Sequence, residues 1–186
     1  MTIQTISGDS VIDFYRYTDK ELQALLKSIT IVIDSREQDS GHLTKWFDEK
    51  KIPFVSQKLD YGDYSCYLPA APELGIIRDL YFDCFVERKA SLEEVSGNLC
   101  EDRTRFESEF LRAKGNRLIL MVEEQAGLEK IIEHKYDTQY NEKSFLASLF
   151  SFGHRYGIDI HFVNKKYAGM FVYMQLYYFV REFLKG

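Results

Sequence analysis

The chain has 186 residues, of which 45% are hydrophobic and 28% charged, so it can bury a real core as one compact domain and is not of the disordered class. Its formal net charge of −5 at pH 7 argues against gripping nucleic acid by bulk positive charge, although acids gathered around bound cations would reverse the potential locally. Three cysteines at irregular spacing indicate neither a disulfide framework nor a paired-thiolate zinc site.

Two further observations concern location. Residues 1–10 are polar and lack the basic and then apolar segments of a secretory signal, so we expect a cytoplasmic protein. The longest apolar run, residues 170–180, is much shorter than the roughly 20 residues that span a bilayer. We therefore expect a packed helix there and no membrane partner.

The first predicted elements are a short helix and a buried strand. Thr18 and Glu21 form a capping box that opens a short amphipathic helix, and we treat residues 1–28 as an N-terminal helical appendage. Residues 29–33 are a β-branched run that predicts a buried strand. This strand ends in charged residues, namely Asp34, Arg36 and Glu37.

A helix and two strands follow. Residues 42–51 predict the helix, and the strands cover residues 54–55 and 64–68, with Asp63 in the turn before the second strand. We expect residues 69–78 to form an extended loop between strands.

Residues 81–89 predict another strand that ends in Glu87-Arg88-Lys89. Because side chains alternate between the faces of a strand, Glu87 and Lys89 should share one face and Arg88 should lie on the other. Residues 91–94 have the pattern of a second capping box, so a helix should begin there.

The remaining elements alternate between helix and strand. A helix from about residue 101 to residues 114–115 precedes a strand at 117–122, a helix at 141–157, a strand at 158–163 and a long apolar C-terminal helix. Strands separated by helices predict an α/β domain over residues 29–186, with helices on both faces of the sheet.

Asp63, Glu87 and Lys89 suggest a hydrolytic site. Carboxylate oxygens bind hard divalent ions, which activate water and neutralise charge in phosphodiester hydrolysis, and a nearby lysine can orient that water. The spacing alone is weak support, because charged strand ends are common.

A resemblance to a known family sharpens this interpretation. Gly62-Asp63 followed by Glu87-Arg88-Lys89 resembles the Gly-Asp…Glu-Arg-Lys signature of the XPF nuclease family, although Glu93 stands where that signature ends in Asp. The segment Asp34-Ser35-Arg36-Glu37 and the helix that contains Arg105 are similar to further parts of the family pattern.

The resemblance implies a restriction-endonuclease-like fold, a central mixed sheet flanked by helices on both faces. It also implies a metal-dependent endonuclease that uses Mg²⁺ or Mn²⁺ and cuts DNA at branched, flap or fork junctions, as a homodimer paired through the C-terminal helices. The catalytic residues it implies are Asp34, Glu37, Asp63, Glu87, Arg88 and Lys89. Of these, Asp34, Asp63 and Glu87 are the expected metal ligands, and Arg36 and Arg105 are expected to bind DNA.

Non-catalytic interpretations of these residues remain open. The family also contains silent members, so the chain could be a DNA-binding or scaffolding partner of an active nuclease. The basic residues between 101 and 114 alternate with acids, as on a solvated helix face. The four histidines share no metal-binding spacing, and we assign none of them to catalysis.

Overall fold

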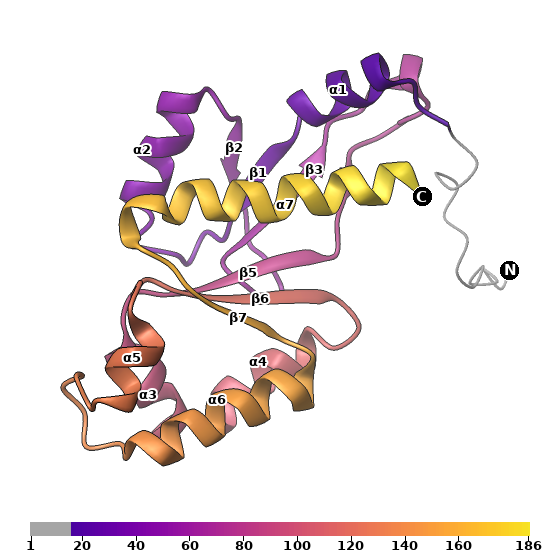
Figure 1. Ribbon diagram of the computed structural model, residues 1–186. Helices are drawn as coiled ribbons and strands as arrows, with labels where there is room; N and C mark the ends of the chain where they lie inside the picture. Colours follow the sequence, from indigo (N-terminus) through magenta and orange to yellow (C-terminus); the bar gives the residue numbers. More distant parts are fainter. Residues whose placement is uncertain (1–15) are drawn as a thin grey trace, which may run out of the picture.

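The computed structural model describes residues 16–186, so residues 1–15 of the expected appendage lie outside the described part (Figure 1). The described part of that segment holds helix α1 (Asp19–Lys27), which begins with the predicted capping box of Thr18 and Glu21. Leu22, Leu25 and Leu26 of α1 are buried in the same core cluster as helix α7. The domain boundary at residue 28 stays a prediction.

A seven-stranded mixed sheet forms the centre, in the order β2-β1-β3-β5-β6-β7, with β4 paired to β3. β1 pairs with β2, β5 with β6, and β6 with β7 in parallel, whereas β3 is antiparallel to β1, β4 and β5. The bounds are β1 Thr30–Ile33, β2 Phe54–Ser56, β3 Tyr64–Leu68, β4 Leu80–Tyr81, β5 Cys84–Lys89, β6 Arg117–Val122 and β7 Asp159–Phe162.

Helices cover both faces of this sheet, which confirms the expected α/β class (Figure 1). On one face lie α1, α2 (Gly41–Lys50) and α7 (Ala168–Lys185). On the other lie α3 (Leu92–Cys100), α4 (Arg103–Arg112), α5 (Gly127–Ile132) and α6 (Glu142–Tyr156). Short 3-10 turns, η2 (Pro72–Leu74) and η3 (Lys165–Tyr167), lie in the connections.

α7 is the apolar C-terminal helix that the sequence predicts. Val172, Leu176 and Val180 are fully buried against the sheet. Within residues 16–186, no helix combines the length and the apolar character needed to cross a membrane.

Two local predictions were wrong in detail. The strand expected at 81–89 is divided into β4 and β5, because β3 changes its register between the pairs Tyr67–Tyr81 and Tyr64–Val86. The Ser65 hydroxyl donates to the carbonyls of Phe82 and Cys84 across this break.

The second capping box is only half formed. The Ser91 hydroxyl accepts from the Glu94 amide at 3.3 Å. The Glu94 carboxylate, however, accepts from the amide of Ala90 at 2.8 Å and not from that of Ser91. The bond that the Glu94 carboxylate accepts therefore comes from the amide one position before the N-cap residue Ser91. Helix α3 still begins where the sequence predicts.

Candidate active site

The predicted site residues meet at one cleft of about 230 Å³ beside the ends of β1 and β5. The cleft is lined by seven of the eight predicted residues, namely Asp34, Arg36, Glu37, Asp63, Glu87, Lys89 and Arg105. Arg88 does not line it, as the alternation along the strand predicted.

A glycine turn places Asp63 between two strands. Gly62 has φ +69, and a Cβ at this position would lie 2.9 Å from the Cβ of Phe85, so this turn excludes a side chain. The Asp63 amide donates to the Val86 carbonyl at 2.9 Å, and its own carbonyl accepts from the Asp34 amide at 2.8 Å. Asp63 is thereby fixed to β5 on one side and to the end of β1 on the other.

The carboxylates of Asp63 and Glu87 share a poorly solvated part of the cleft. Burial raises the pKa of Asp63 well above its usual range, the charge of Glu87 raises it further, and the hydrogen bond from the Arg88 amide opposes both. That amide lies 2.7 Å from Asp63 Oδ2. Two acids that repel each other in this way are well suited to a divalent cation between them.

Lys89 is the cation already present beside this pair. Its Nζ lies 2.8 Å from Glu87 Oε1 and 3.5 Å from Glu94 Oε1. The same atom is 5.2 Å from the centroid of the Phe106 ring. Burial disfavours the charged form, but the carboxylate of Glu87 outweighs it, so the pKa of Lys89 is raised and the ammonium persists.

Asp34 makes a full set of hydrogen bonds within the protein. Its Oδ1 accepts from the Arg36 amide at 2.7 Å and from Arg36 Nε at 2.8 Å. Its Oδ2 accepts from Arg36 Nη2 and from the Leu59 amide, both at 2.8 Å. These bonds outweigh burial and lower the pKa of Asp34. Its role as a metal ligand stays a prediction.

Three neighbours were missed from the sequence. Glu109 of α4 lines the cleft, and burial followed by the charge of Glu87 raises its pKa. Behind β5, Glu123 and His42 contact each other and Arg88 contacts Glu123. Glu123 directly follows the strand predicted at 117–122, but nothing local in the sequence connects it to Arg88 and His42, which are 35 and 81 positions away.

The donor set fits a hard metal ion in its chemistry. Asp63 and Glu87 offer carboxylate oxygens, the ligands that Mg²⁺ and Mn²⁺ take. Over residues 16–186, however, no three His, Cys, Asp or Glu side chains are already arranged to hold a metal. Two protein ligands, with water and phosphate oxygens completing the shell, is the usual binding mode of Mg²⁺.

Comparisons with known proteins identify a domain family and a similar fold. The sequence model of the ERCC4 domain matches residues 33–173. XPF from Aeropyrum pernix has a similar fold, with a TM-score of 0.59 and 18% identity over 82% of this chain and 65% of that chain. The same protein in complex with DNA gives a TM-score of 0.58 and 17% identity, covering 82% of this chain and 66% of that one.

The likeness is therefore one of fold, and this chain spans slightly less than two thirds of the length of those XPF chains. No curated protein matches the sequence.

Proposed function

The chain belongs to the ERCC4 domain family as an XPF-type nuclease domain, and from this premise we propose that it is a metal-dependent DNA endonuclease. The observation that carries the proposal is the grouping of Asp63 and Glu87 with Lys89 in one cleft, where Lys89 Nζ lies 2.8 Å from Glu87. Branched, flap or fork junctions are the proposed substrates, and the cell interior is the proposed location.

Asp63 and Glu87 would hold the ion, Mg²⁺ or Mn²⁺. When bound, such an ion lowers the pKa of water and neutralises charge on the phosphate. Lys89 orients the attacking water and balances Glu87, since its ammonium is held in place by two carboxylates. Asp34 fixes the chain at Leu59, next to the turn that carries Asp63. Glu37 completes the acidic wall of the cleft.

Arg36 and Arg105 are proposed to hold the phosphates of the DNA strand. Their side chains are 61% and 79% exposed, and both line the cleft. Arg105 makes only a loose ion pair, at 3.7 Å, with Glu109. A planar guanidinium with free donors binds phosphate oxygens in pairs, which suits Arg105. Arg36 already donates from Nε and Nη2 to Asp34 and Leu59, so it would reach a phosphate through Nη1.

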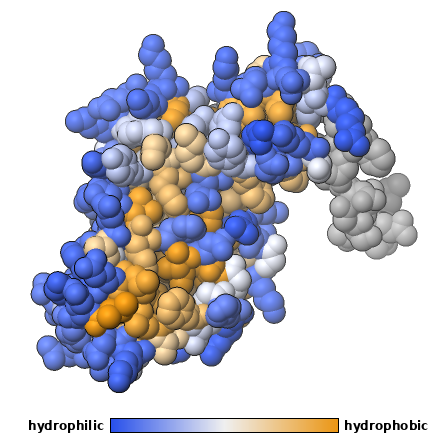
Figure 2. All heavy atoms as spheres, in the orientation of Figure 1, coloured by the Kyte–Doolittle hydropathy of each residue, from blue (hydrophilic) through white to orange (hydrophobic). Residues whose placement is uncertain are grey.

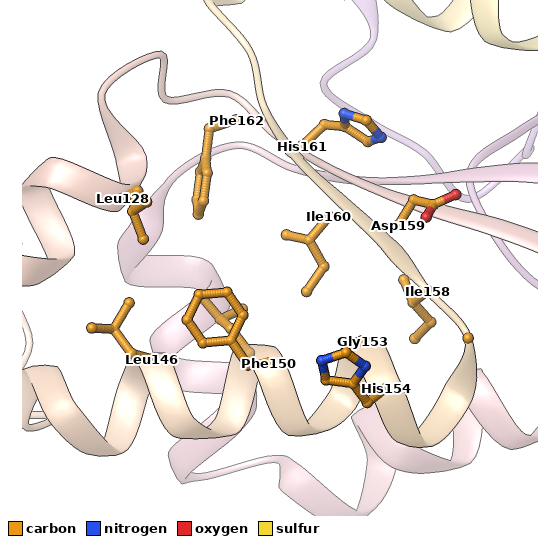
Figure 3. Close-up of a pocket in the computed structure, with 12 residues that line it drawn as sticks. Leu128, Leu146, Phe150, Gly153, His154, Ile158, Asp159, Ile160, His161 and Phe162 are labelled. Carbon is orange, nitrogen blue, oxygen red and sulfur yellow. The ribbon is translucent and has the colours of Figure 1, made fainter.

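We propose a homodimer that pairs through α7 together with the neighbouring sheet edge. β7 is an edge strand, and below it an apolar groove of about 590 Å³ runs between β7 and α6, with Phe150 56% exposed (Figure 3). Above it, Tyr167 at the end of η3 and three residues of α7, Met170, Met174 and Tyr178, form an exposed stripe. Figure 2 shows apolar residues gathered on this face of the molecule. An apolar groove and an exposed apolar helix stripe on one face are features of protein interfaces.

A cleavage assay tests the activity. Labelled single-stranded, duplex, 3′-flap and forked DNAs are incubated with Mg²⁺, Mn²⁺ or EDTA, and the wild type is compared with Asp63→Ala and Lys89→Ala. We expect metal-dependent cutting that both variants lose. Asp48→Ala and Lys50→Ala, which change exposed residues of α2, are matched controls that should cut normally. DNA binding without cutting by the wild type would favour the scaffold alternative.

Sedimentation tests the dimer. Met174→Glu places a charge in the apolar stripe and should convert the dimer to a monomer. Ile77→Glu is the control, because Ile77 is 81% exposed on the loop between β3 and β4. A wild type that sediments as a monomer at all concentrations would rule out the proposed pairing.

A further inference from the structure

A second polar cluster lies behind the active site, on the face of β5 opposite Lys89. At its centre the guanidinium of Arg88 forms a two-pronged pair with Glu123, with Nε–Oε1 at 2.8 Å and Nη2–Oε2 at 2.9 Å. The ring nitrogen Nε2 of His42 lies 2.6 Å from Glu123 Oε1. The three side chains come from β5, from the residue after β6 and from the first turn of α2.

The cluster reaches the catalytic cleft through Arg88. Arg88 Nη1 lies 3.4 Å from Glu37 Oε1, and Nη2 lies 3.1 Å from Asp39 Oδ2. The backbone amide of the same residue holds Asp63 Oδ2 at 2.7 Å. Arg88 thus contacts two acids of the cleft, one through its main chain and one through its side chain.

Glu123 is too deeply buried to meet a substrate itself. Its side chain is 0% exposed and that of Arg88 is 4% exposed. Neither residue lines the cleft. A buried guanidinium requires a carboxylate partner, and Glu123 supplies both oxygens of a planar fork that fixes the position of Arg88.

Tyr64 lies in the same buried surroundings. Its hydroxyl has no hydrogen-bond partner among residues 16–186. Burial first, and then the charge of Glu37, raise the pKa of Tyr64. The charges of Arg88 and Glu37 therefore both act on the buried surroundings of Tyr64, and Glu37 lies where this cluster meets the cleft.

We propose that Glu123 and His42 are positioning residues of the nuclease site, which act by holding Arg88 where it orients Glu37 and the end of β5 that carries Glu87 and Lys89. His42 holds the carboxylate of Glu123, and Glu123 holds the guanidinium of Arg88. Arg88 in turn contacts Glu37 through its side chain and Asp63 through its backbone amide. This inference rests on the proposed endonuclease function, and it assigns to Arg88 a role behind the cleft.

The test uses Glu123→Gln, which puts an amide donor against the guanidinium, and His42→Phe, which removes the ring nitrogens. His42→Gln is the conservative variant, because its amide can still donate to Glu123. His134→Phe is the matched control, since His134 is exposed, lies outside the cleft, and contacts Glu142 at 3.3 Å and the ring of Tyr136, on which a phenylalanine can still stack. Four quantities are measured: kcat and KM for DNA cleavage, Mn²⁺ affinity without DNA, DNA affinity in EDTA, and Tm.

We expect Glu123→Gln to lower kcat and Mn²⁺ affinity by roughly 10- to 100-fold, the usual effect of residues that orient metal ligands. DNA affinity in EDTA should stay within about twofold of wild type, since no phosphate contact is lost. His42→Phe should show a smaller loss of about 10-fold, and His42→Gln should restore most of it.

Variants that have a lower Tm but normal kcat and Mn²⁺ affinity would show that the cluster is merely structural. If Glu123→Gln does not fold, the His42 pair decides the question, because that ring is partly exposed at the edge of the cluster. A wild type that neither cuts DNA nor binds Mn²⁺ would refute the proposed function and the inference together. A wild type that cuts, with unaffected variants, would refute the inference alone.

Discussion

Replacing Gly62 by alanine is the sharpest test of how the turn positions Asp63. The added Cβ would lie 2.9 Å from the Phe85 Cβ and 3.5 Å from the Val86 carbonyl oxygen. Both neighbours belong to β5, so neither can move away like the end of a flexible side chain. The turn must shift, and Asp63 shifts with it.

The loss of folding stability in Gly62→Ala has two contributions. A left-handed backbone costs an alanine roughly 1–2 kcal/mol, and crowding in a packed region adds about 1–3 kcal/mol. Gly157 supplies the first contribution alone, because it has φ 65 and a Cβ there would meet no other heavy atom of residues 16–186 within 4 Å. Both substitutions reduce the entropy of the unfolded chain equally. We expect losses of about 2–5 kcal/mol for Gly62→Ala and about 1–2 kcal/mol for Gly157→Ala.

Urea unfolding and single-turnover cleavage measure the two consequences. With about 2–4 °C per kcal/mol for a chain of this length, Gly62→Ala should also melt well below Gly157→Ala. Below its Tm, Gly62→Ala should cut about 100-fold more slowly, because a displacement of about 1 Å at a catalytic group has this effect. Gly157→Ala should cut normally. Equal stability losses, or normal cutting by Gly62→Ala, would refute the reasoning.

Three further predictions concern charge and packing. Burial and the charge of Glu87 raise the pKa of Asp63, so the folded protein loses stability as the pH rises and this carboxyl must ionise. Asp63→Asn should therefore stabilise the metal-free protein at pH 7 by about 1 kcal/mol. Near pH 3, where the carboxyl is protonated, the substitution should make no difference, and thermal melts in EDTA measure both effects. Arg36→Ala removes two hydrogen bonds from the buried carboxylate of Asp34 and should cost about 1–3 kcal/mol. It should also lower by about one the slope of log DNA affinity against log salt, and an unchanged slope would contradict a phosphate contact. Phe110→Ala removes a buried ring that packs on Phe106, Phe152 and Tyr156 and should cost about 3–5 kcal/mol in urea unfolding, whereas a loss below about 1 kcal/mol would contradict the packing.

The sequence predicted the elements that have their own local signals. The β-branched run before Asp34 became β1, and the alternation along Glu87, Arg88 and Lys89 correctly divided these residues between two faces. The break between β4 and β5 was missed, because it depends on the register with β3 and not on the composition of the strand. Helix α5 was missed as well, since six residues are too few for a clear period.

The site was predicted as far as its residues lie at strand ends. Asp63 and Glu87 were grouped with Lys89 from their residue types at a turn and a strand end, whereas Asp34 joined them only through the resemblance to the XPF nuclease family. Strand pairing brings all three acids to one cleft. Glu109 could not be grouped with them, because a helical acid among arginines has the same pattern on a solvated face.

Alternation along β5 also explains why a Glu-Arg-Lys run belongs to two clusters. Glu87 and Lys89 contact each other in the cleft, so Arg88 must project to the opposite face, where it would be buried without a partner unless an acid met it there. β6 is parallel to β5 with Lys89 opposite Val122, so the next residue, Glu123, arrives beside the end of β5. The parallel register therefore supplies the acid that Arg88 requires, and the same strand end that presents the catalytic pair is anchored from behind.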